Sequence, residues 1–570
     1  MMKCQSFIPL FLILHLSAGA SSSLTKASGG HWRLLHQNIG ISATHMQLLN
    51  NDRVVLFDGA HFGPSNLTVP AGNCRRHRRG NKVDCTAHSA EYDVATNTIR
   101  PLMINTADDG VWCSSAAVTS DGRGFLRFVQ TDGDGNGVEA RVRNYNPCSV
   151  SNSDSNCVWE VMDVVLAARG HRRFYPTNHV RSSGRHIIIG RGRGSLFTYE
   201  FFPKTQSVSS TKLYNLVPFA NNNNNVYPFM FLNTDGNIFI FNNNRAILFD
   251  FVNNKVVKIY PEIPGGGDPR TYYSSAVLLP LNNLTSNMVV EAEVLICGGA
   301  PKGSYSQALK GNFIRASNTC ARIKITDPKP KWVIETMPQA RVMADMTLLP
   351  NGDVLIINGA EAGTAGRNLG RKPVFQPLIY RPNSKYGVGS GFKLQNPSSI
   401  PRMYLSTAIL LRDGRVLVGG SNPSMNYNFS SGVVFPTELR LEAFSPWYLD
   451  EEFSNLRPTI IYPPNDTKLG YRQKLTIRFT VIGNGGGGGG SIAKDSVLVT
   501  MVSPSYTTNS FSMNHRELVL DPERVAQVVQ NVYEVVVTTP PSTNLAPPGF
   551  YLLFVIHQEI PSEGIAVMIG

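Results

Sequence analysis

The sequence predicts an all-β protein in which a seven-bladed β-propeller over residues 31–450 precedes an antiparallel β-sandwich over residues 456–570. Three observations predict this fold. A short unit of two strands recurs seven times along the chain, and the recurrence stops after Leu449. Beyond that point the sequence alternates apolar and polar residues between proline-rich turns. No segment keeps a helical period over three turns, and glycine and proline are scattered throughout.

In the repeated unit an apolar pair leads into a tight turn, a β-branched strand follows, and glycine or another turn residue ends the unit. The dipeptides Asp-Gly and Asn-Gly supply the positive φ angles that a two-residue hairpin turn requires, so each unit is predicted to be the inner hairpin of a four-stranded blade. The seven units lie at residues 48–59, 118–131, 179–192, 231–244, 292–299, 348–359 and 410–420, and the fifth keeps only the strand and the glycines.

The C-terminal region is predicted to be an immunoglobulin-like sandwich. Its expected strands are KLTIRFTVI, SVLVTMV, VYEVVVTTP and GFYLLFVI, which are short, rich in β-branched residues and separated by turn residues.

The first residues have the features of a secretory signal peptide over residues 1–20. Lys3 supplies the positive charge, an apolar run extends from Phe7 to Leu16, and small residues precede a cleavage site after Ala20. No other apolar stretch approaches the roughly 20 residues that a membrane helix needs, and no hydrophobic tail directs a lipid anchor. We therefore expect a secreted protein of the cell wall or apoplast, without a membrane partner. The glycosylation sequons of such a glycoprotein stand at Asn66, Asn283, Asn428 and Asn465.

Cysteine spacing predicts a set of local disulfides. Removal of the leader with Cys4 leaves seven cysteines, an odd number in an oxidising compartment. Six of them are close neighbours in sequence, and the expected pairs are Cys74 with Cys85, Cys148 with Cys157, and Cys297 with Cys320. Cys113 is left over, either as a buried thiol or as a residue with a special role.

The net charge of +13 suggests an acidic partner, although the positive residues are spread thinly. The densest run is Arg75, Arg76, His77, Arg78 and Arg79, inside the expected loop between Cys74 and Cys85. This run is either a solvated loop tip or a patch that binds an acidic cell-wall polysaccharide. Nucleic acid is not expected as a partner outside the cell.

Several strings resemble the copper-radical oxidases of the plant glyoxal oxidase type, which are relatives of galactose oxidase with a kelch-type propeller. The strings are GISATHMQLLNNDRVVLFD, FGPSNLT, DGVWCSS, RRFYPTN, PQARVMADMTLLPNGDVLIINGAEAGTAG, PRMYLSTAILLRDGRVLVGGSNP, LEAFSPWYL and SPSYTTNSFSMNHR. They are distributed over nearly all of the chain that follows the leader.

The resemblance implies a catalytic centre built on copper and a modified tyrosine. In the family a cysteine joins a tyrosine through a thioether, and the matching residues are Cys113 and Tyr175. The matching second tyrosine, a copper ligand and general base, is Tyr404. The family reaction converts a small aldehyde or primary alcohol and dioxygen into the oxidised product and hydrogen peroxide.

The sequence departs from the family at both copper-binding histidines. The motif that carries the first histidine reads PRMYLSTA, with Leu405 in its place, and the motif that carries the second reads TTNSF, with Asn509 in its place. Leucine has no donor atom, and an amide oxygen is a hard, weak donor for copper. Tyr175 and Tyr404 are then the metal ligands that remain.

Two other histidines, His179 and His515, are candidates to replace the missing imidazoles. They follow Tyr175 and Asn509 by four and six residues. Extended chain advances about 3.3 Å per residue, and a metal–nitrogen bond is about 2 Å long, so neither is expected to reach without a sharp reversal of the chain.

Two functions therefore remain open. The protein is either an oxidase of aldehydes or primary alcohols, supported by Cys113, Tyr175 and Tyr404, or a catalytically silent extracellular propeller. The silent form, a pseudoenzyme that serves as a cell-wall binding or structural module, is supported by the loss of both histidines.

Overall fold

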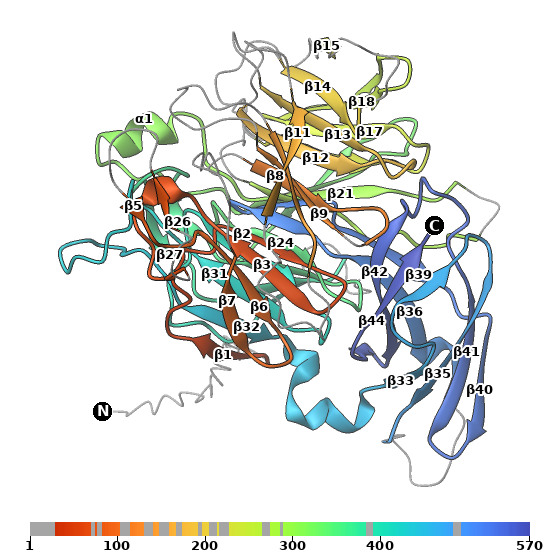
Figure 1. Cartoon of the computed structure of the whole chain (residues 1–570). Helices are drawn as coiled ribbons and strands as arrows, with labels where there is room; N and C mark the ends of the chain where they lie inside the picture. The colour runs from red at the N-terminus through yellow and green to blue at the C-terminus, as the bar shows by residue number, and fades with distance from the viewer. Residues whose placement is uncertain are drawn as a thin grey trace, which may run out of the picture.

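The computed structural model describes residues 29–69, 74–76, 83–102, 114–122, 124–129, 141–147, 159–166, 174–191, 197–204, 214–215, 227–264, 274–285, 289–382, 391–482 and 492–570. Cys4, Cys113, Cys148, Cys157 and the expected leader lie outside these residues. The described residues form an all-β structure with many small antiparallel sheets (Figure 1).

Seven of these sheets each contain four strands that pair in chain order, except that the seventh takes its last strand from the N-terminal end. We call the first of the four the innermost strand of its sheet. The first three sheets are formed by β2 (His45–Leu48), β3 (Arg53–Phe57), β6 (Ser89–Asp93) and β7 (Thr98–Pro101); by β8 (Ser114–Val118), β9 (Phe125–Val129), β10 (Arg141–Tyr145) and β11 (Trp159–Val165); and by β12 (Phe174–Val180), β13 (His186–Arg191), β14 (Phe197–Phe202) and β15 (Tyr214–Asn215).

The fourth to sixth sheets repeat this arrangement. They are formed by β16 (Phe229–Leu232), β17 (Ile238–Asn242), β18 (Arg245–Asp250) and β19 (Lys255–Ile259); by β20 (Ser275–Leu278), β21 (Glu293–Cys297), β22 (Thr319–Lys324) and β23 (Trp332–Thr336); and by β24 (Asp345–Leu348), β25 (Val354–Ile357), β28 (Leu378–Tyr380) and β29 (Phe392–Leu394).

The seventh sheet joins the two ends of this region. Its strands β30 (Ser406–Leu410), β31 (Val416–Gly420) and β32 (Leu441–Ser445) are completed by β1 (His31–His36), which comes from the N-terminal end and pairs with β32. Sequence separation between β1 and β32 is large, so this pairing ties the start of the repeat region to its end.

Six of the repeated units hold the turn and second strand of a hairpin between the first two strands of one sheet, as expected. The unit at 292–299 holds only β21, because a long segment separates it from β20. The tight turns are not of the predicted two-residue type. In the sixth sheet, Leu349 N donates to Asp353 O at 2.8 Å, so three residues form the loop. Gly352 is the residue of that loop with a positive φ, 87°. This is a type I turn followed by one left-handed residue, which needs a single glycine where the two-residue turn would need two left-handed residues. The prediction of two-residue turns was wrong for this reason.

The elements between these strands are short. Helix α1 (Ser304–Leu309) and the hairpin β26 (Ala360–Gly363) and β27 (Gly370–Pro373) lie between the second and third strands of the fifth and sixth sheets. A second small hairpin, β4 (Arg75–Arg76) and β5 (Val83–Asp84), lies in the corresponding loop of the first sheet. One turn of 3-10 helix covers Ala60–Phe62, and two more cover Trp447–Leu449 and Glu451–Leu456.

The C-terminal region adds two further sheets that share one hydrophobic cluster, while alternate residues of the second sheet, such as Leu552 and Phe554, belong to another cluster. The four strands predicted there are present as β35, β36, β41 and β42. The first sheet contains β33 (Thr459–Tyr462), β35 (Lys474–Thr480), β41 (Val532–Thr538) and β40 (Arg524–Val529). The second contains β34 (Thr467–Leu469), β44 (Ile565–Ile569), β42 (Gly549–His557), β36 (Val497–Ser503), β39 (Arg516–Leu520) and the short β43 (Ile560–Pro561), and a 3-10 turn covers Lys494–Ser496.

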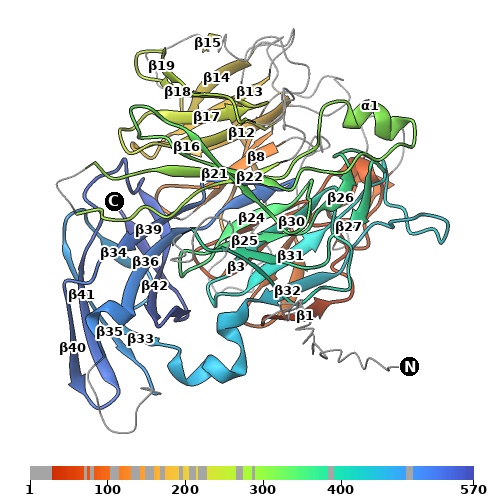
Figure 2. The ribbon, with the colours of Figure 1, turned by 180° about the vertical axis from the view of Figure 1, so that it is seen from behind.

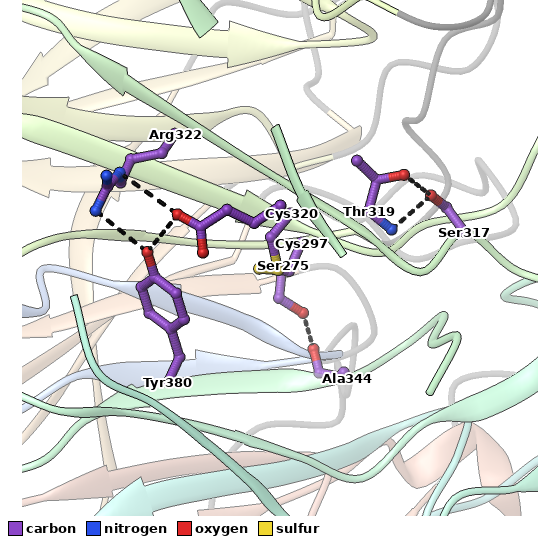
Figure 3. The surroundings of a disulfide bond; sticks show 9 residues. Ser275, Cys297, Ser317, Thr319, Cys320, Arg322, Ala344 and Tyr380 are labelled. Atoms are coloured by element: carbon purple, nitrogen blue, oxygen red, sulfur yellow. Dashed lines mark hydrogen bonds and ion pairs between the residues drawn. A yellow bond between two sulfur atoms is a disulfide. The ribbon is translucent and has the colours of Figure 1, made fainter. Parts of the chain in front are cut away.

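Two of the predicted disulfides are present. Cys74 is bonded to Cys85 at the base of the β4–β5 hairpin. Cys297 and Cys320 are bonded directly across β21 and β22, where both are buried. Figure 3 shows Ser275 beside this second disulfide, with its hydroxyl donating to the carbonyl oxygen of Ala344. The fifth sheet is thereby tied to the segment that enters the sixth.

Candidate functional site

A hairpin from the C-terminal region enters the middle of the seven sheets. Its strands β37 (Tyr506–Thr508) and β38 (Phe511–Met513) join β2, so that the first sheet has six strands. Strand β37 contacts β2, β8 and β30, while β38 contacts β12, β16, β20 and β24. The hairpin therefore contacts the innermost strand of every one of the seven sheets.

The turn of this hairpin lies where the innermost strands begin. Thr508, the last residue of β37, is opposite His45, the first residue of β2. The turn residues Asn509 and Ser510 both have positive φ angles, 49° and 70°, as a two-residue hairpin turn requires. Asparagine adopts this backbone conformation more readily than most residues, because its short polar side chain forms local hydrogen bonds. The residue at position 509 thus suits its turn.

Tyr175 is at the same end of the sheets. It is the second residue of β12, is half-buried, and has a positive φ of 49°. Its ring meets the ring of Tyr227 edge to face at 5.3 Å, and Tyr227 in turn packs against Phe511 of the hairpin at 5.2 Å. A continuous line of aromatic rings therefore leads from Tyr175 to the hairpin.

Tyr404 and Leu405 directly precede β30 and also lie at this end. They are buried, with 7 % and 4 % of their surface exposed. Their carbonyl oxygens accept hydrogen bonds from Asn422 N at 2.9 Å and Ser421 N at 3.0 Å, which fixes the backbone of the segment. The structure thus brings four of the predicted residues to one end of the inner strands. The fifth, Cys113, immediately precedes β8 in the sequence but lies outside the described residues.

Asn509 is in an environment that leaves its amide oxygen unused. The residue is 4 % exposed, and within the described part of the chain its Oδ1 atom has no hydrogen-bond partner. An unsatisfied buried acceptor costs about 1–3 kcal/mol. The turn of the hairpin therefore carries a buried acceptor that no described residue satisfies.

The two histidines considered as replacements lie at the other end of the hairpin. Asn514, next to His515, accepts a hydrogen bond from Val180 N at 2.8 Å, and Val180 is the last residue of β12. His179 Nδ1 bonds the carbonyl oxygen of Val180 at 2.6 Å. Burial lowers the pKa of His179 to about 4 and that of His515 to about 3, so both imidazoles are neutral.

A cleft at this other end has a volume of about 540 Å³ including its open mouth. It is lined by His179, Asn514 and Arg516 among others. The cleft is separate from Asn509, Tyr404 and Tyr175 because it lies at the far ends of β12 and the hairpin.

Sequence analysis missed an aromatic network that surrounds the start of β8. His45 Nδ1 lies 2.8 Å from the hydroxyl of Tyr506, and the His45 ring stacks on Phe57 at 4.5 Å. The hydroxyls of Tyr506 and Tyr227 each lie 3.4 Å from the carbonyl oxygen of Ser114, the residue after Cys113. One signal was available, because His45 is a histidine three residues before the first repeat unit.

Among the described residues, no three histidine, cysteine, aspartate or glutamate side chains gather in a group that could hold a metal ion. Of the residues that the family motifs mark, the donors at this end of the sheets are the phenols of Tyr175 and Tyr404 and the amide of Asn509. His45 and the buried Asp345 begin β2 and β24 at the same end. The site is thus an enclosed aromatic and apolar region with few metal-binding atoms.

Comparison with known proteins identifies the family. Residues 44–448 match the model of the glyoxal oxidase N-terminus, and residues 457–569 match the galactose oxidase-like, early set domain. The chain is 40 % identical to aldehyde oxidase GLOX1 of Arabidopsis thaliana over 547 residues, which cover 94 % of this chain and 84 % of that protein. It is 38 % identical to aldehyde oxidase GLOX of Vitis pseudoreticulata over 544 residues, or 94 % of this chain and 96 % of the relative.

A solved structure shares the fold. It is described as a novel fungal alcohol oxidase of the AA5 family in complex with copper, and it superposes with a TM-score of 0.69 at 15 % identity. The match covers 95 % of this chain and 99 % of the fungal one. The aldehyde oxidase relatives and the match over residues 44–448 show that this chain belongs to the glyoxal oxidase family of galactose oxidase-like copper-radical oxidases.

Proposed function

We propose that this chain is a secreted member of the glyoxal oxidase family that has lost the copper-dependent reaction and serves as a binding module in the cell wall. The observation that carries the proposal is the pair Leu405 and Asn509. Both are buried at the end of the inner strands where the hairpin turn arrives, and neither supplies an imidazole.

The residues present do not fit a copper ion held by two imidazoles. Leu405 belongs to the same hydrophobic cluster as Met343 and Met403 and offers no donor atom. Asn509 offers an amide oxygen, whereas Cu(II) prefers imidazole nitrogen. The two phenols and one amide that stand at the family's ligand positions are a weak ligand set, so we derive no catalytic step through copper for this chain.

The second candidate function is the oxidase reaction of the family, with a small aldehyde or alcohol as substrate. It is favoured by the position of the two tyrosines. Tyr175 and Tyr404 lie at the same end of the inner strands, and the residue before β8 is the cysteine expected to modify Tyr175. This candidate requires copper to bind without either family histidine.

We further propose that the seven sheets are the blades of a kelch-type propeller over residues 31–450, with an immunoglobulin-like sandwich over residues 456–570. Support comes from β1, which completes the seventh sheet, and from the hairpin that contacts all seven inner strands. A strand exchanged between the first and last sheets is one way in which a radial arrangement avoids an open edge.

Secretion is supported by the two disulfides, because such bonds persist in oxidising compartments and are rare in the cytosol. The sequon residues Asn66, Asn283 and Asn465 are exposed, and Asn428 is half-buried. Within the described residues, no helix has the length and apolar character needed to cross a bilayer.

The test is the metal content and activity of the full chain secreted from a eukaryotic host. Copper is measured by elemental analysis before and after loading with Cu(II), and peroxide release is measured with glyoxal and methylglyoxal. The Vitis pseudoreticulata aldehyde oxidase, carried through the same steps, is the positive control. We expect well below one copper per chain and no peroxide above background. Stoichiometric copper together with peroxide release would overturn the proposal in favour of the oxidase.

A further inference from the structure

Two neighbouring loops at the site end of the fifth and sixth sheets concentrate positive charge. Residues 298–318 and 358–377 contain six cationic side chains and a single carboxylate, that of Glu361. We call their surface the basic platform, and define it by Lys302, Lys310, Arg315, Arg367, Arg371 and Lys372. All except Arg371, which is half-buried, are exposed.

The two loops of the basic platform lie side by side. Ala316 N donates to Glu361 O at 2.7 Å, and Gly363 N donates to Ile314 O at 2.7 Å, so the segment after α1 runs along β26. The guanidinium of Arg371 on β27 lies over the ring of Phe313 at 4.0 Å. Figures 1 and 2 show α1, β26 and β27 together at one edge of the molecule.

Four of these cations are not neutralised by any carboxylate that the structure describes. In the described part of the chain, Lys310, Arg315, Arg371 and Lys372 form no ion pair with a carboxylate. Other arginines of the same end are paired, such as Arg440 with Glu438 and Arg402 with Glu442. Like charges held close together repel one another and leave a positive potential at the surface, which an anionic partner relieves.

Exposed aromatic rings lie on the same two loops and on a third loop that is hydrogen-bonded to them. Tyr305 of α1 is 49 % exposed, and Phe375, which follows β27, is 37 % exposed. Phe429, 53 % exposed, stacks on Tyr427 at 6.2 Å in the loop after β31. That loop is joined to the platform by the hydrogen bond from Asn368 N to Pro423 O at 2.8 Å. Aromatic faces offer rigid apolar area for the C–H face of a sugar ring.

We propose that the basic platform binds a polyuronate, a polysaccharide chain with a carboxylate on each sugar. Repeated carboxylates match the spaced cations, and the sugar rings match the aromatic faces of Tyr305, Phe375 and Phe429. This inference rests on the proposed role as a binding module and names its partner. A lipid headgroup layer would meet the charges but would not need three separate aromatic rings.

The platform also borders the candidate site. A Cβ atom on Gly370 of β27 would come within 2.8 Å of Met343 Cε and 3.6 Å of Met403 Sδ. Met343 accepts the hydrogen bond of Ser510, and Met403 precedes Tyr404. A chain bound on the platform would therefore pass close to the region where the hairpin turn lies.

The test uses the full secreted chain with polygalacturonate as the probe, and fully methyl-esterified polygalacturonate as the neutral comparison. We expect polygalacturonate to bind, the ester to bind at least about tenfold more weakly, and binding to weaken as salt rises. The charge-reversing variant Arg315→Glu/Lys372→Glu is expected to lose about tenfold in affinity or more.

The matched control is Lys329→Glu/Lys331→Glu. These exposed lysines lie in the loop between β22 and β23, at the opposite end of the same sheet, and the variant changes net charge by the same amount. We expect it to bind within about twofold of the wild type. Equal losses in both variants, or equal binding of the polyuronate and its ester, would overturn the proposal.

An aromatic variant separates the two kinds of anionic partner. Phe429→Ala is expected to weaken polygalacturonate binding severalfold, because it removes exposed apolar area without changing charge. Tighter binding to vesicles that contain phosphatidylserine than to polygalacturonate would overturn the proposal in favour of an anionic membrane. Circular dichroism checks that each variant folds, and the comparison of polyuronate with ester on the wild type needs no variant. Copper content, measured on the same preparation, reports on the proposed function separately.

Discussion

The hydroxyl of Ser510 donates a hydrogen bond to the carbonyl oxygen of Met343 at an O–O distance of 2.9 Å. Ser510 belongs to the turn of the C-terminal hairpin, and Met343 precedes the innermost strand of the sixth sheet. The bond joins residues that are 167 positions apart in the sequence. It shows that the C-terminal region completes the centre of the seven-sheet region.

We predict that Ser510→Ala loosens the hairpin turn. The substitution leaves a buried carbonyl oxygen without its partner, which costs about 1–3 kcal/mol. Amide exchange in a peptide that covers residues 506–513, followed by mass spectrometry, should become faster. Ser512→Ala is the control, because Ser512 is half-buried and its bond to Met346 O is longer, 3.2 Å. Equal exchange in the wild type and Ser510→Ala would contradict the prediction.

The thioether between Cys113 and Tyr175 is predicted to be absent from most molecules. Its formation in the family is oxidative and needs copper, and the donors found around Asn509 suit copper poorly. Peptide mass spectrometry after reduction and alkylation should recover the two peptides separately. A joined pair, lighter by two hydrogens in most molecules, would show that copper has acted at this site.

Restoring both imidazoles is predicted to restore copper binding. Leu405 and Asn509 have positive φ angles of 65° and 49°, a conformation that histidine adopts more often than leucine does. Leu405→His/Asn509→His should therefore fold and take up about one copper per chain, while each single change should do little because the ligands act together.

Leu405→Phe/Asn509→His is the control for that variant, since phenylalanine brings a ring of similar size without a donor nitrogen. Copper stoichiometry and peroxide release are measured on each protein. A folded double-histidine variant that binds no copper would show that other parts of the site have also changed.

Acidification is predicted to destabilise the protein through His515. Burial lowers its pKa to about 3, against about 6.5 in the unfolded chain, so only the unfolded chain takes up a proton between these values. The contribution of neutral His515 to the free energy of unfolding is fully present above about pH 6.5. Below that pH it falls by about 1.4 kcal/mol per pH unit.

The buried carboxyls of Asp345 and Glu517 have the opposite effect, because burial raises their pKa values. Their protonation on acidification favours the folded protein. The comparison of wild type with His515→Leu isolates the histidine. The melting temperature of the variant should fall less between pH 6.5 and pH 4.5, and parallel curves would contradict the assignment.

Peptide mapping without reduction tests the remaining predicted disulfide, Cys148 with Cys157. We expect this pair beside Cys74 with Cys85 and Cys297 with Cys320. A disulfide that includes Cys113 would contradict the assignment, because it would leave a different cysteine unpaired.

The sequence by itself determined the β-rich fold, the sevenfold recurrence of a strand unit and the four strands of the C-terminal region. These features depend on local chemistry. Glycine supplies the left-handed residue of a turn at positions such as Gly352, and alternation of apolar residues marks a half-buried strand. The pairing of Cys297 with Cys320 followed in the same way, because neighbouring strands place the two residues side by side. Family motifs, rather than local chemistry, marked Tyr175, Tyr404, Leu405 and Asn509.

Only the tertiary structure decided which segments meet. The hairpin with Asn509 pairs with β2, which is distant in sequence. No local pattern predicts that a hairpin of the C-terminal region adds strands to the first sheet. Tertiary contacts also produce the network of His45 and Tyr506, the separation of His515 from Asn509, and the basic platform. Each depends on contacts between residues far apart in sequence, which hydrophobic burial and shape complementarity select only once the sheets have assembled.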